Sequence, residues 1–231
     1  MSGKTFEQCV KSLESGEIKT LEKLFDLWEE AHKKEDENSF KETKPKALPD
    51  DVKERFIPDG SLSSNAIEKH SILFVCRESN VSAGTDGRFW MKDVVECKMK
   101  GRVLENADAT AKRSATKYFN CMEALARELN QGGMLETCAY MNINKRGGFA
   151  SADFRSLGKY AKKYQAFIKK EIEILQPDVI VILGRFFDNK ELCELFQSLP
   201  YEIRQYKRHP SVWKKWGEQV IPEKLFNKQI N

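Results

Sequence analysis

The sequence predicts an α/β fold: an open, parallel, four-stranded sheet in three layers, flanked by helices and preceded by an N-terminal helical extension. Continuous apolar runs at 72–76 and 179–183 are typical of strands that are buried on both faces. Amphipathic helical patterns alternate with such runs along the chain. Strands that alternate with helices favour right-handed crossovers and a parallel sheet.

Residues 1–60 are expected to form a helical extension and a linker, and residues 61–231 the α/β domain. Thr5 and Gln8 fit a capping box at the start of a short helix, and a second helix is expected from Ile18 to His32. The charged, proline-containing stretch that follows is typical of a linker or strap, whose residues 56–60 dock on the main domain. The helix around Trp28 is expected to pack on its own domain, and a contact through residues 1–32 with a protein partner is the alternative.

The α/β domain is expected to continue with further strands and helices. The strands are expected at 72–76, 137–143, 179–183 and 202–207, and helices at 89–97, 108–129, 153–175, 189–199 and from 213 onward. In an open parallel sheet the ligand crevice lies beyond the carboxyl ends of the strands. The loops that follow Cys76, Asn142 and Arg208 meet that condition.

Composition limits the function classes. The chain has 231 residues, 40% of them hydrophobic, and a net charge of +4, which permits nucleic-acid binding without indicating it. No apolar run approaches the ~20 residues that span a bilayer, and the N-terminus lacks an apolar signal core. We therefore expect a cytoplasmic protein with no membrane contact. The six cysteines are at least 17 residues apart, so we expect buried, reduced thiols, no metal and no cofactor.

The first candidate loop joins Arg77, Glu78 and Asn80, directly after a buried strand. A carboxylate at this point could orient a water molecule or stabilise a developing cation. The alternative is that Arg77 and Glu78 pair with each other or face solvent.

In the second candidate segment, alternation along a strand places Asn142 and Asn144 on the same side. A carboxamide suits the edge of a nucleobase because it offers donors and an acceptor in one plane. The alternative is an asparagine that bonds a local loop backbone. Lys145 and Arg146 follow, and they form a basic patch or a solvated face.

The third candidate loop contains His209 and Ser211 around a proline suited to a first helical turn. The imidazole could stabilise an oxyanion in the crevice, and the hydroxyl could bond a phosphate. The alternative is a structural turn histidine. The other two histidines, His32 and His70, are expected to be exposed.

Three segments together resemble motifs of the uracil-DNA glycosylase superfamily. They are ILFVCRESN at the first strand end, YMNINKR followed by the helix and strand KKEIEILQPDVIVILG, and KRHPS. The resemblance covers residues 67–231 and lacks the superfamily's iron–sulfur cysteine pattern. It implies the uracil-DNA glycosylase-like fold and a DNA-repair hydrolase that flips a base and cleaves its N-glycosidic bond.

The resemblance also implies roles for individual residues. Glu78 and His209 would be catalytic, acting on the attacking water and on the departing base. Asn142 would read the base, and Phe89 or Trp90 would stack on it. The remaining substrate-binding candidates are Arg77, Asn80 and Ser211. The first loop departs from the family because Cys76, Ser79 and Asn80 replace two glycines and a proline. A non-catalytic nucleic-acid or nucleotide binder on the same fold is therefore the alternative.

Overall fold

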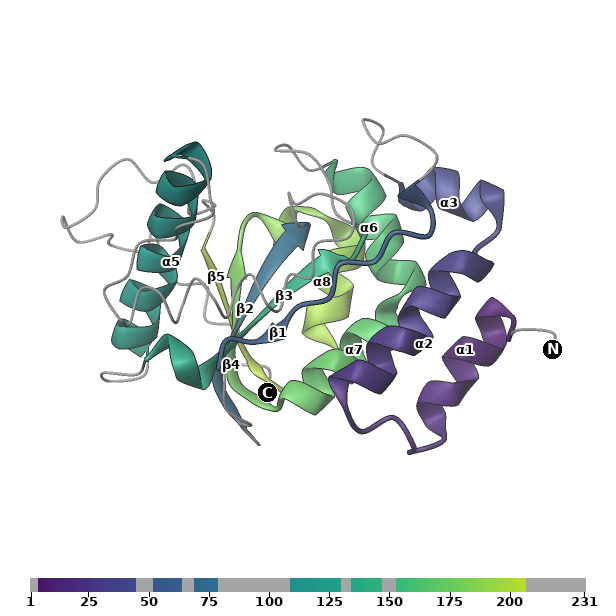
Figure 1. Cartoon of the computed structure of the whole chain (residues 1–231), viewed down its shortest axis with the longest axis horizontal. Helices are drawn as coiled ribbons and strands as arrows, with labels where there is room; N and C mark the ends of the chain where they lie inside the picture. Colours follow the sequence, from purple (N-terminus) through teal and green to yellow (C-terminus); the bar gives the residue numbers. More distant parts are fainter. Residues whose placement is uncertain are drawn as a thin grey trace.

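The computed structural model describes residues 4–44, 52–63, 69–78, 109–129, 134–146 and 153–206. The helices are α1 Phe6–Glu14, α2 Leu21–Lys34, α3 Glu37–Thr43, α5 Ala109–Leu129, α6 Phe154–Lys163, α7 Gln165–Leu175 and α8 Lys190–Gln197, with short 3-10 turns at Leu135–Thr137 and Phe186–Asp188. The strands are β1 Gly60–Ser61, β2 His70–Glu78, β3 Cys138–Asn144, β4 Pro177–Leu183 and β5 Glu202–Tyr206. The predicted α/β class is confirmed (Figure 1).

The sheet has five strands in the order β1-β3-β2-β4-β5, instead of the four expected from the sequence. Strands β2 to β5 are parallel, and β1 pairs with β3 in the antiparallel direction, with Gly60 opposite Tyr140. A strand of two residues carries no recognisable alternation, which is why the sequence pattern missed it. The four parallel strands are those expected from the sequence at 72–76, 137–143, 179–183 and 202–207.

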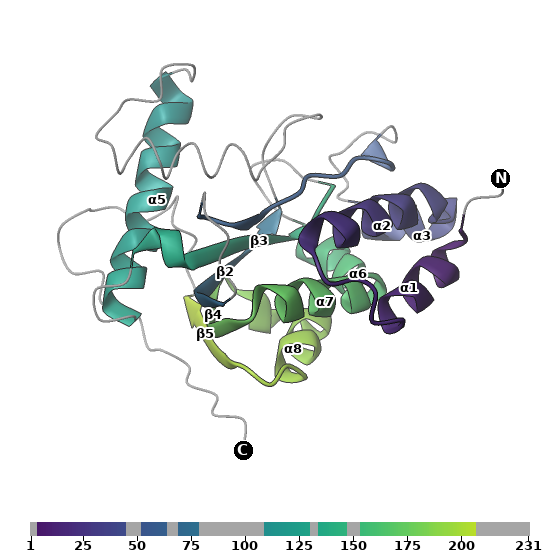
Figure 2. The same ribbon diagram turned by 60° about the horizontal axis from the view of Figure 1, so that its bottom comes forward.

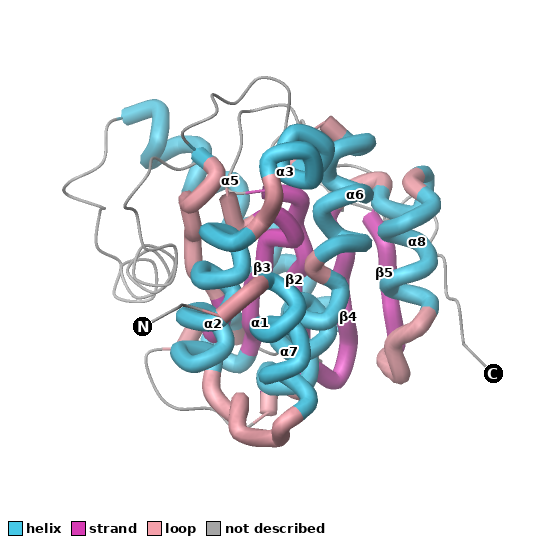
Figure 3. The backbone as a smooth tube through the Cα atoms, turned by 90° about the vertical axis from the view of Figure 1, so that its right-hand side faces the viewer, coloured by secondary structure: helices cyan, strands magenta, loops and turns pink. Residues whose placement is uncertain are grey.

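Helices cover both faces of the sheet, as Figure 1 and Figure 2 show. Helix α5 lies on one face, where Phe119 and Met122 pack against Phe74 and other inward side chains of the strands. Helices α1, α2, α6, α7 and α8 lie on the opposite face and share a larger apolar cluster with it (Figure 3). Because β2 is followed by α5 whereas β3 is followed by α6 and α7, the crossovers leave on opposite sides.

The N-terminal helices belong to the same apolar cluster as the sheet. The capping box of Thr5 and Gln8 begins α1 as expected, and α1 packs on α2 and α7. Trp28 of α2 is fully buried, with its ring 5.3 Å from that of Phe167 and 6.1 Å from that of Tyr164. Its side chain therefore contacts the protein's own core and is not exposed to a partner.

Two expectations about local structure were wrong. The stretch expected to be a linker contains helix α3, which begins at the Asp36 cap, where the carboxylate accepts from the backbone of Ser39. The single long helix expected at 153–175 is two helices, α6 and α7, separated at Tyr164. Gln176 then adopts a left-handed conformation with φ 45°, which ends α7 and lets β4 begin at the next residue.

Candidate functional site

The strand order marks one place where a ligand crevice is expected. The chain passes from β2 to β3 on one side and from β4 to β5 on the other. The connections that leave the carboxyl ends of the neighbouring strands β2 and β4 therefore diverge, and open α/β sheets bind ligands at such a switch point. Glu78 ends β2 there, and Gly184 follows β4 with φ 149°, a conformation that favours glycine.

The two motif-bearing strands are neighbours in the sheet. In the parallel pairing of β2 with β3, Cys76 lies opposite Asn142 and Glu78 lies opposite Asn144. Two of the three candidate segments therefore reach the same edge of the sheet. The guanidinium of Arg77 lies at this edge too, 5.6 Å from the centre of the Phe154 ring at the start of α6.

The carboxamide of Asn142 is buried and bonded at both ends. Its Nδ2 donates to Asp59 Oδ2 at 3.3 Å, and its Oδ1 accepts from the Tyr140 hydroxyl at 3.0 Å. The backbone N–H of Asn142 also donates to Asp59 Oδ2, at 2.6 Å. Asn144, the other asparagine of the pair, accepts from the backbone of Arg146 at 3.0 Å, which is the local loop contact considered as its alternative.

Lys145 and Arg146 are not a solvated basic patch. Both side chains are fully buried, and this corrects the expectation of an exposed basic segment after β3. A buried cation requires a counter-charge because removal from water is unfavourable for an ion. Each of the two has its own set of acidic partners.

Lys145 pairs with two carboxylates from distant parts of the chain. Its Nζ forms a short ion pair with Asp59 and lies 2.9 Å from the carboxylate of Glu171 on α7. Burial alone would lower the pKa of Lys145, but these two carboxylates raise it above its usual value. Burial also raises the pKa of Glu171 well above its usual value, with Asp59 acting in the same direction and Lys145 opposing. Glu171 therefore keeps its proton to higher pH than an exposed glutamate does.

Arg146 pairs with Glu35, which lies between α2 and α3. The same guanidinium donates to the hydroxyls of Tyr164, at 3.1 Å, and Thr43, at 3.2 Å. Tyr164 donates in turn to Glu35 at 3.0 Å. All of these groups are buried, so the ion pair fastens the helical N-terminal segment to the end of β3.

The histidines in described positions are buried, which contradicts the expectation that His32 and His70 are exposed. His32 is 0% exposed and His70 is 3% exposed. The Nδ1–H of His32 donates to the Arg55 carbonyl at 3.0 Å, and its Nε2 accepts from the Tyr160 hydroxyl at 2.8 Å. Burial, with Arg146 nearby, holds the pKa of His32 well below its usual value, so the imidazole is neutral. His70 donates to the Leu175 carbonyl at 2.6 Å, near the amino ends of the strands.

Motif analysis missed the residues that hold this region together. Glu35 and Asp59 lie in the stretch that was expected to be a linker, and Glu171 lies within the apolar stripe of a helix. No sequence signal marked these acids in advance: Lys and Arg are almost never fully buried, so a Lys-Arg pair after a strand predicts an exposed position. Only the observed burial of the two cations creates the need for counter-charges.

Five predicted site residues lie outside the residues that the structure describes: Asn80, Phe89, Trp90, His209 and Ser211. Their roles, and that of Glu78 in catalysis, stay predictions. Five of the six cysteines are described, and none of the five is in a disulfide; Cys9, Cys76, Cys121 and Cys138 are buried and Cys193 is half-buried. Burial raises the pKa of Cys138 to about 11, so this thiol stays protonated. Within the described ranges, no three His, Cys, Asp or Glu side chains gather in a way that suits a metal ion.

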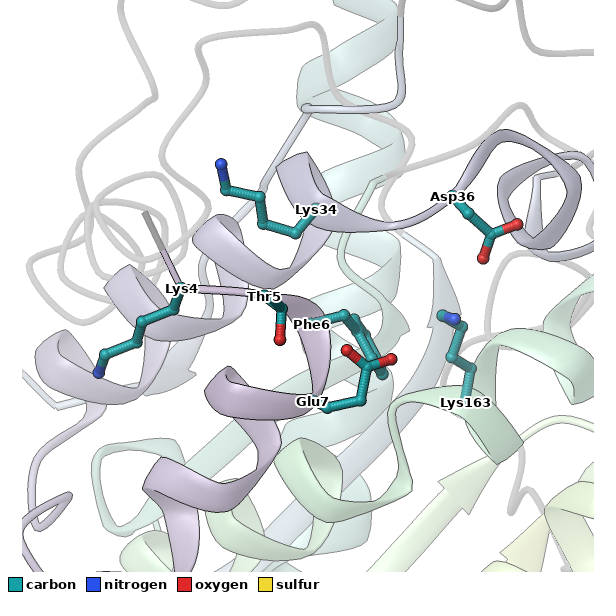
Figure 4. Close-up of a pocket in the computed structure, with 7 residues that line it drawn as sticks. All are labelled: Lys4, Thr5, Phe6, Glu7, Lys34, Asp36 and Lys163. Atoms are coloured by element: carbon teal, nitrogen blue, oxygen red, sulfur yellow. The ribbon is translucent and has the colours of Figure 1, made fainter. Parts of the chain in front are cut away.

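A surface hollow of about 310 Å³ lies where the start of α1 meets the end of α2, the cap of α3 and the end of α6 (Figure 4). Its charged lining combines three lysines with two acids: Lys4, Lys34, Lys163, Glu7 and Asp36. The Lys4 and Lys34 side chains extend away from Lys163 in Figure 4, and Lys163 lies 4.1 Å from the centre of the Phe6 ring. The lysines therefore do not converge on a common point.

Comparison with known proteins finds no matching family model, no matching curated protein and no matching solved structure. In the described part of the chain, no helix combines the length and the apolar character that crossing a membrane requires. The candidate site is therefore defined by its residues alone. It comprises the carboxyl ends of β2 and β3, with Asn142 held by Asp59 and Tyr140.

Proposed function

We propose that this chain is a DNA glycosylase-like hydrolase that removes uracil or another damaged base by cleaving its N-glycosidic bond. One observation supports the proposal most: β2 and β3 are adjacent and parallel, so Glu78 and the Asn142 segment reach one edge of the sheet. That edge borders the switch point between β2 and β4, where ligands bind in open α/β sheets.

In the proposed reaction a flipped base enters the crevice and Asn142 hydrogen-bonds its edge. The bond between C1′ of the sugar and the base nitrogen breaks, and the base keeps the electron pair. Glu78 positions the water whose oxygen bonds to C1′, and His209 stabilises the negative charge on the departing base. The water proton ends on the base or on a nearby acceptor, so the products are free base and an abasic sugar.

The test measures free base released from oligonucleotides that contain uracil, hypoxanthine or xanthine. We expect release by the unmodified protein and a loss of about 10²-fold or more in Asn142→Ala and His209→Ala, the usual size for removal of one stabilising group. Asn38→Ala is the matched control, because Asn38 is an exposed asparagine on α3. No release from any substrate, or full activity in both variants, would refute the proposal.

The second candidate is a non-catalytic binder of nucleic acid or nucleotides, and one feature of β2 favours it. Cys76 takes the place of a glycine of the family loop, and its side chain is buried in the cluster on the α5 face, so it fills space. A binder would retain oligonucleotides without releasing base, and its affinity would fall as salt rises because bound counterions are released. Filter binding at 50 and 200 mM salt, in parallel with the release assay, separates the two candidates.

A further inference from the structure

Asp59 contacts both the buried ion pair and the candidate site. It immediately precedes β1 and is 1% exposed. Its Oδ1 pairs with Lys145, and its Oδ2 accepts from the backbone and the side chain of Asn142, at 2.6 and 3.3 Å. An acid of the N-terminal segment is therefore in direct contact with the proposed base-reading residue.

These contacts permit only one orientation of the Asn142 carboxamide. The Asp59 carboxylate only accepts hydrogen bonds, so it requires the NH₂ end of Asn142, and the Tyr140 hydroxyl donates to Oδ1 at the other end, at 3.0 Å. Rotation of the amide by 180° would place Oδ1 against the carboxylate, two acceptors in a buried position. Such a contact between two acceptors, one of them charged, is strongly unfavourable in a buried position.

We propose that Asp59 is a positioning residue that fixes the orientation of the Asn142 carboxamide, and that the Lys145 ion pair holds Asp59 in place. The oriented amide keeps one N–H and one lone pair of Oδ1 for a ligand. The N–H suits an acceptor on the base and Oδ1 suits an adjacent donor, which is the arrangement found in uracil. Cytosine presents these groups in the reversed order, which this orientation disfavours. The orientation of the carboxamide does not depend on the proposed function. Only the identity of the ligand rests on that function.

The first test follows the Asn142 carboxamide by NMR in the full chain labelled with ¹⁵N-asparagine. Its two side-chain proton signals are assigned by their loss in Asn142→Asp. The test variant combines Asp59→Asn with Lys145→Met, which removes both charges together and leaves no unpaired cation. We expect the Asn142 signals to shift or double as the amide samples both orientations. Tyr140→Phe removes the second contact, keeps the ion pair and is expected to shift the same signals by a smaller amount.

Unchanged Asn142 signals in the folded double variant would overturn the proposal. If the double variant does not fold, slow hydrogen exchange of one Asn142 side-chain proton in the unmodified protein is the second measurement. The proton bonded to Asp59 should exchange at least tenfold more slowly than its geminal partner. Equal exchange of the two protons would overturn the proposal as well.

The second test uses the rate of base release. We expect the uracil-to-cytosine ratio of kcat/KM to fall at least tenfold in the double variant, a change that loss of stability alone would not produce. An unchanged ratio would contradict the role in specificity. Absence of release by the unmodified protein would refute the proposed function, whereas the NMR result would still decide the role of Asp59.

Discussion

Helices cover both faces of the sheet, but the two faces are held to them by different interactions. On the α5 face the described core consists of aliphatic, aromatic and sulfur-containing side chains, such as Phe74, Phe119 and Met122. The opposite face has a larger apolar cluster and, beside it, the buried cations Lys145 and Arg146 with their acidic partners. Apolar burial is non-directional, whereas a buried charge is stable only with its specific partner.

This difference explains how the N-terminal segment is placed. Both cations follow β3, and each has an acid from the first 60 residues: Asp59 for Lys145 and Glu35 for Arg146. Ile57 adds a backbone hydrogen bond to the Lys145 carbonyl at 2.7 Å, which confirms the expected docking of residues 56–60. Charge pairs therefore fix the position of the N-terminal segment, whereas α5 is held by the burial of apolar surface. Substitutions on the two faces should differ accordingly.

The largest effect is expected from Arg146→Met, because the buried Glu35 carboxylate then lacks its cation. Breaking a buried ion pair on one side typically destabilises a protein by about 3–5 kcal/mol. Urea denaturation measures the free energy of unfolding. The control is Arg127→Met, whose arginine pairs with Glu123 and is 68% exposed, and which should change stability by less than about 0.5 kcal/mol.

Combining Arg146→Met with Glu35→Gln sharpens the same comparison, because it removes both charges. We expect this double variant to recover most of the loss, since neutral replacements of buried ion pairs are often tolerated. A loss below about 1 kcal/mol in Arg146→Met alone would contradict the view that charge holds this face.

The next effect is expected from His32→Phe, which keeps an aromatic ring but removes both imidazole nitrogens. The Tyr160 hydroxyl and the Arg55 carbonyl each lose a buried partner, which corresponds to a loss of about 1–3 kcal/mol. Thermal unfolding measures it. In the double variant with Tyr160→Phe the two losses should not add, because one hydrogen bond is shared. Strict additivity would show that the two groups act independently.

Stability should depend on pH through Glu171, because its pKa is raised in the folded state. Above about pH 4.5 the unfolded chain gives up this proton while the folded protein keeps it, so stability falls as pH rises, by up to about 1.4 kcal/mol per pH unit. His32, with its lowered pKa, acts with the opposite sign below about pH 6.5. We compare the free energy of unfolding of the unmodified protein with that of Glu171→Gln, because the His32 contribution cancels in the difference. A difference that does not change between pH 5 and 8 would exclude a raised pKa for Glu171.

The smallest effect is expected from Met122→Leu on the α5 face, a volume-conserving change among apolar neighbours. Such changes usually alter stability by less than about 1.5 kcal/mol. Lys145→Met, the corresponding change in the charged cluster, should destabilise the protein more, since it leaves the buried Asp59 carboxylate without its cation. Equal losses in the two variants, measured by urea denaturation, would remove the distinction between the faces.

Local patterns in the sequence predicted most elements of the described fold. The apolar runs at 72–76 and 179–183 lie within β2 and β4, and the capping box at Thr5 began α1. The candidate site was predicted only in part. Asn142 and Glu78 were identified from their places at strand ends, whereas Asp59 and Tyr140, which fix the Asn142 carboxamide, were not. The role of Asp59 arises from a contact between the β1 side of the sheet and β3, which sequence periodicity does not predict, whereas Tyr140 lies two residues before Asn142 on the same strand.

The sequence by itself determined the α/β class and the positions of the parallel strands, because apolar periodicity and capping depend on neighbours within a few residues. Only the tertiary structure decided that His32 is buried, that Lys145 and Arg146 lie in the interior and that the expected linker supplies their acids. Those outcomes depend on which distant groups meet. The charge of a side chain limits its possible partners, but the packing of the whole chain selects one of them.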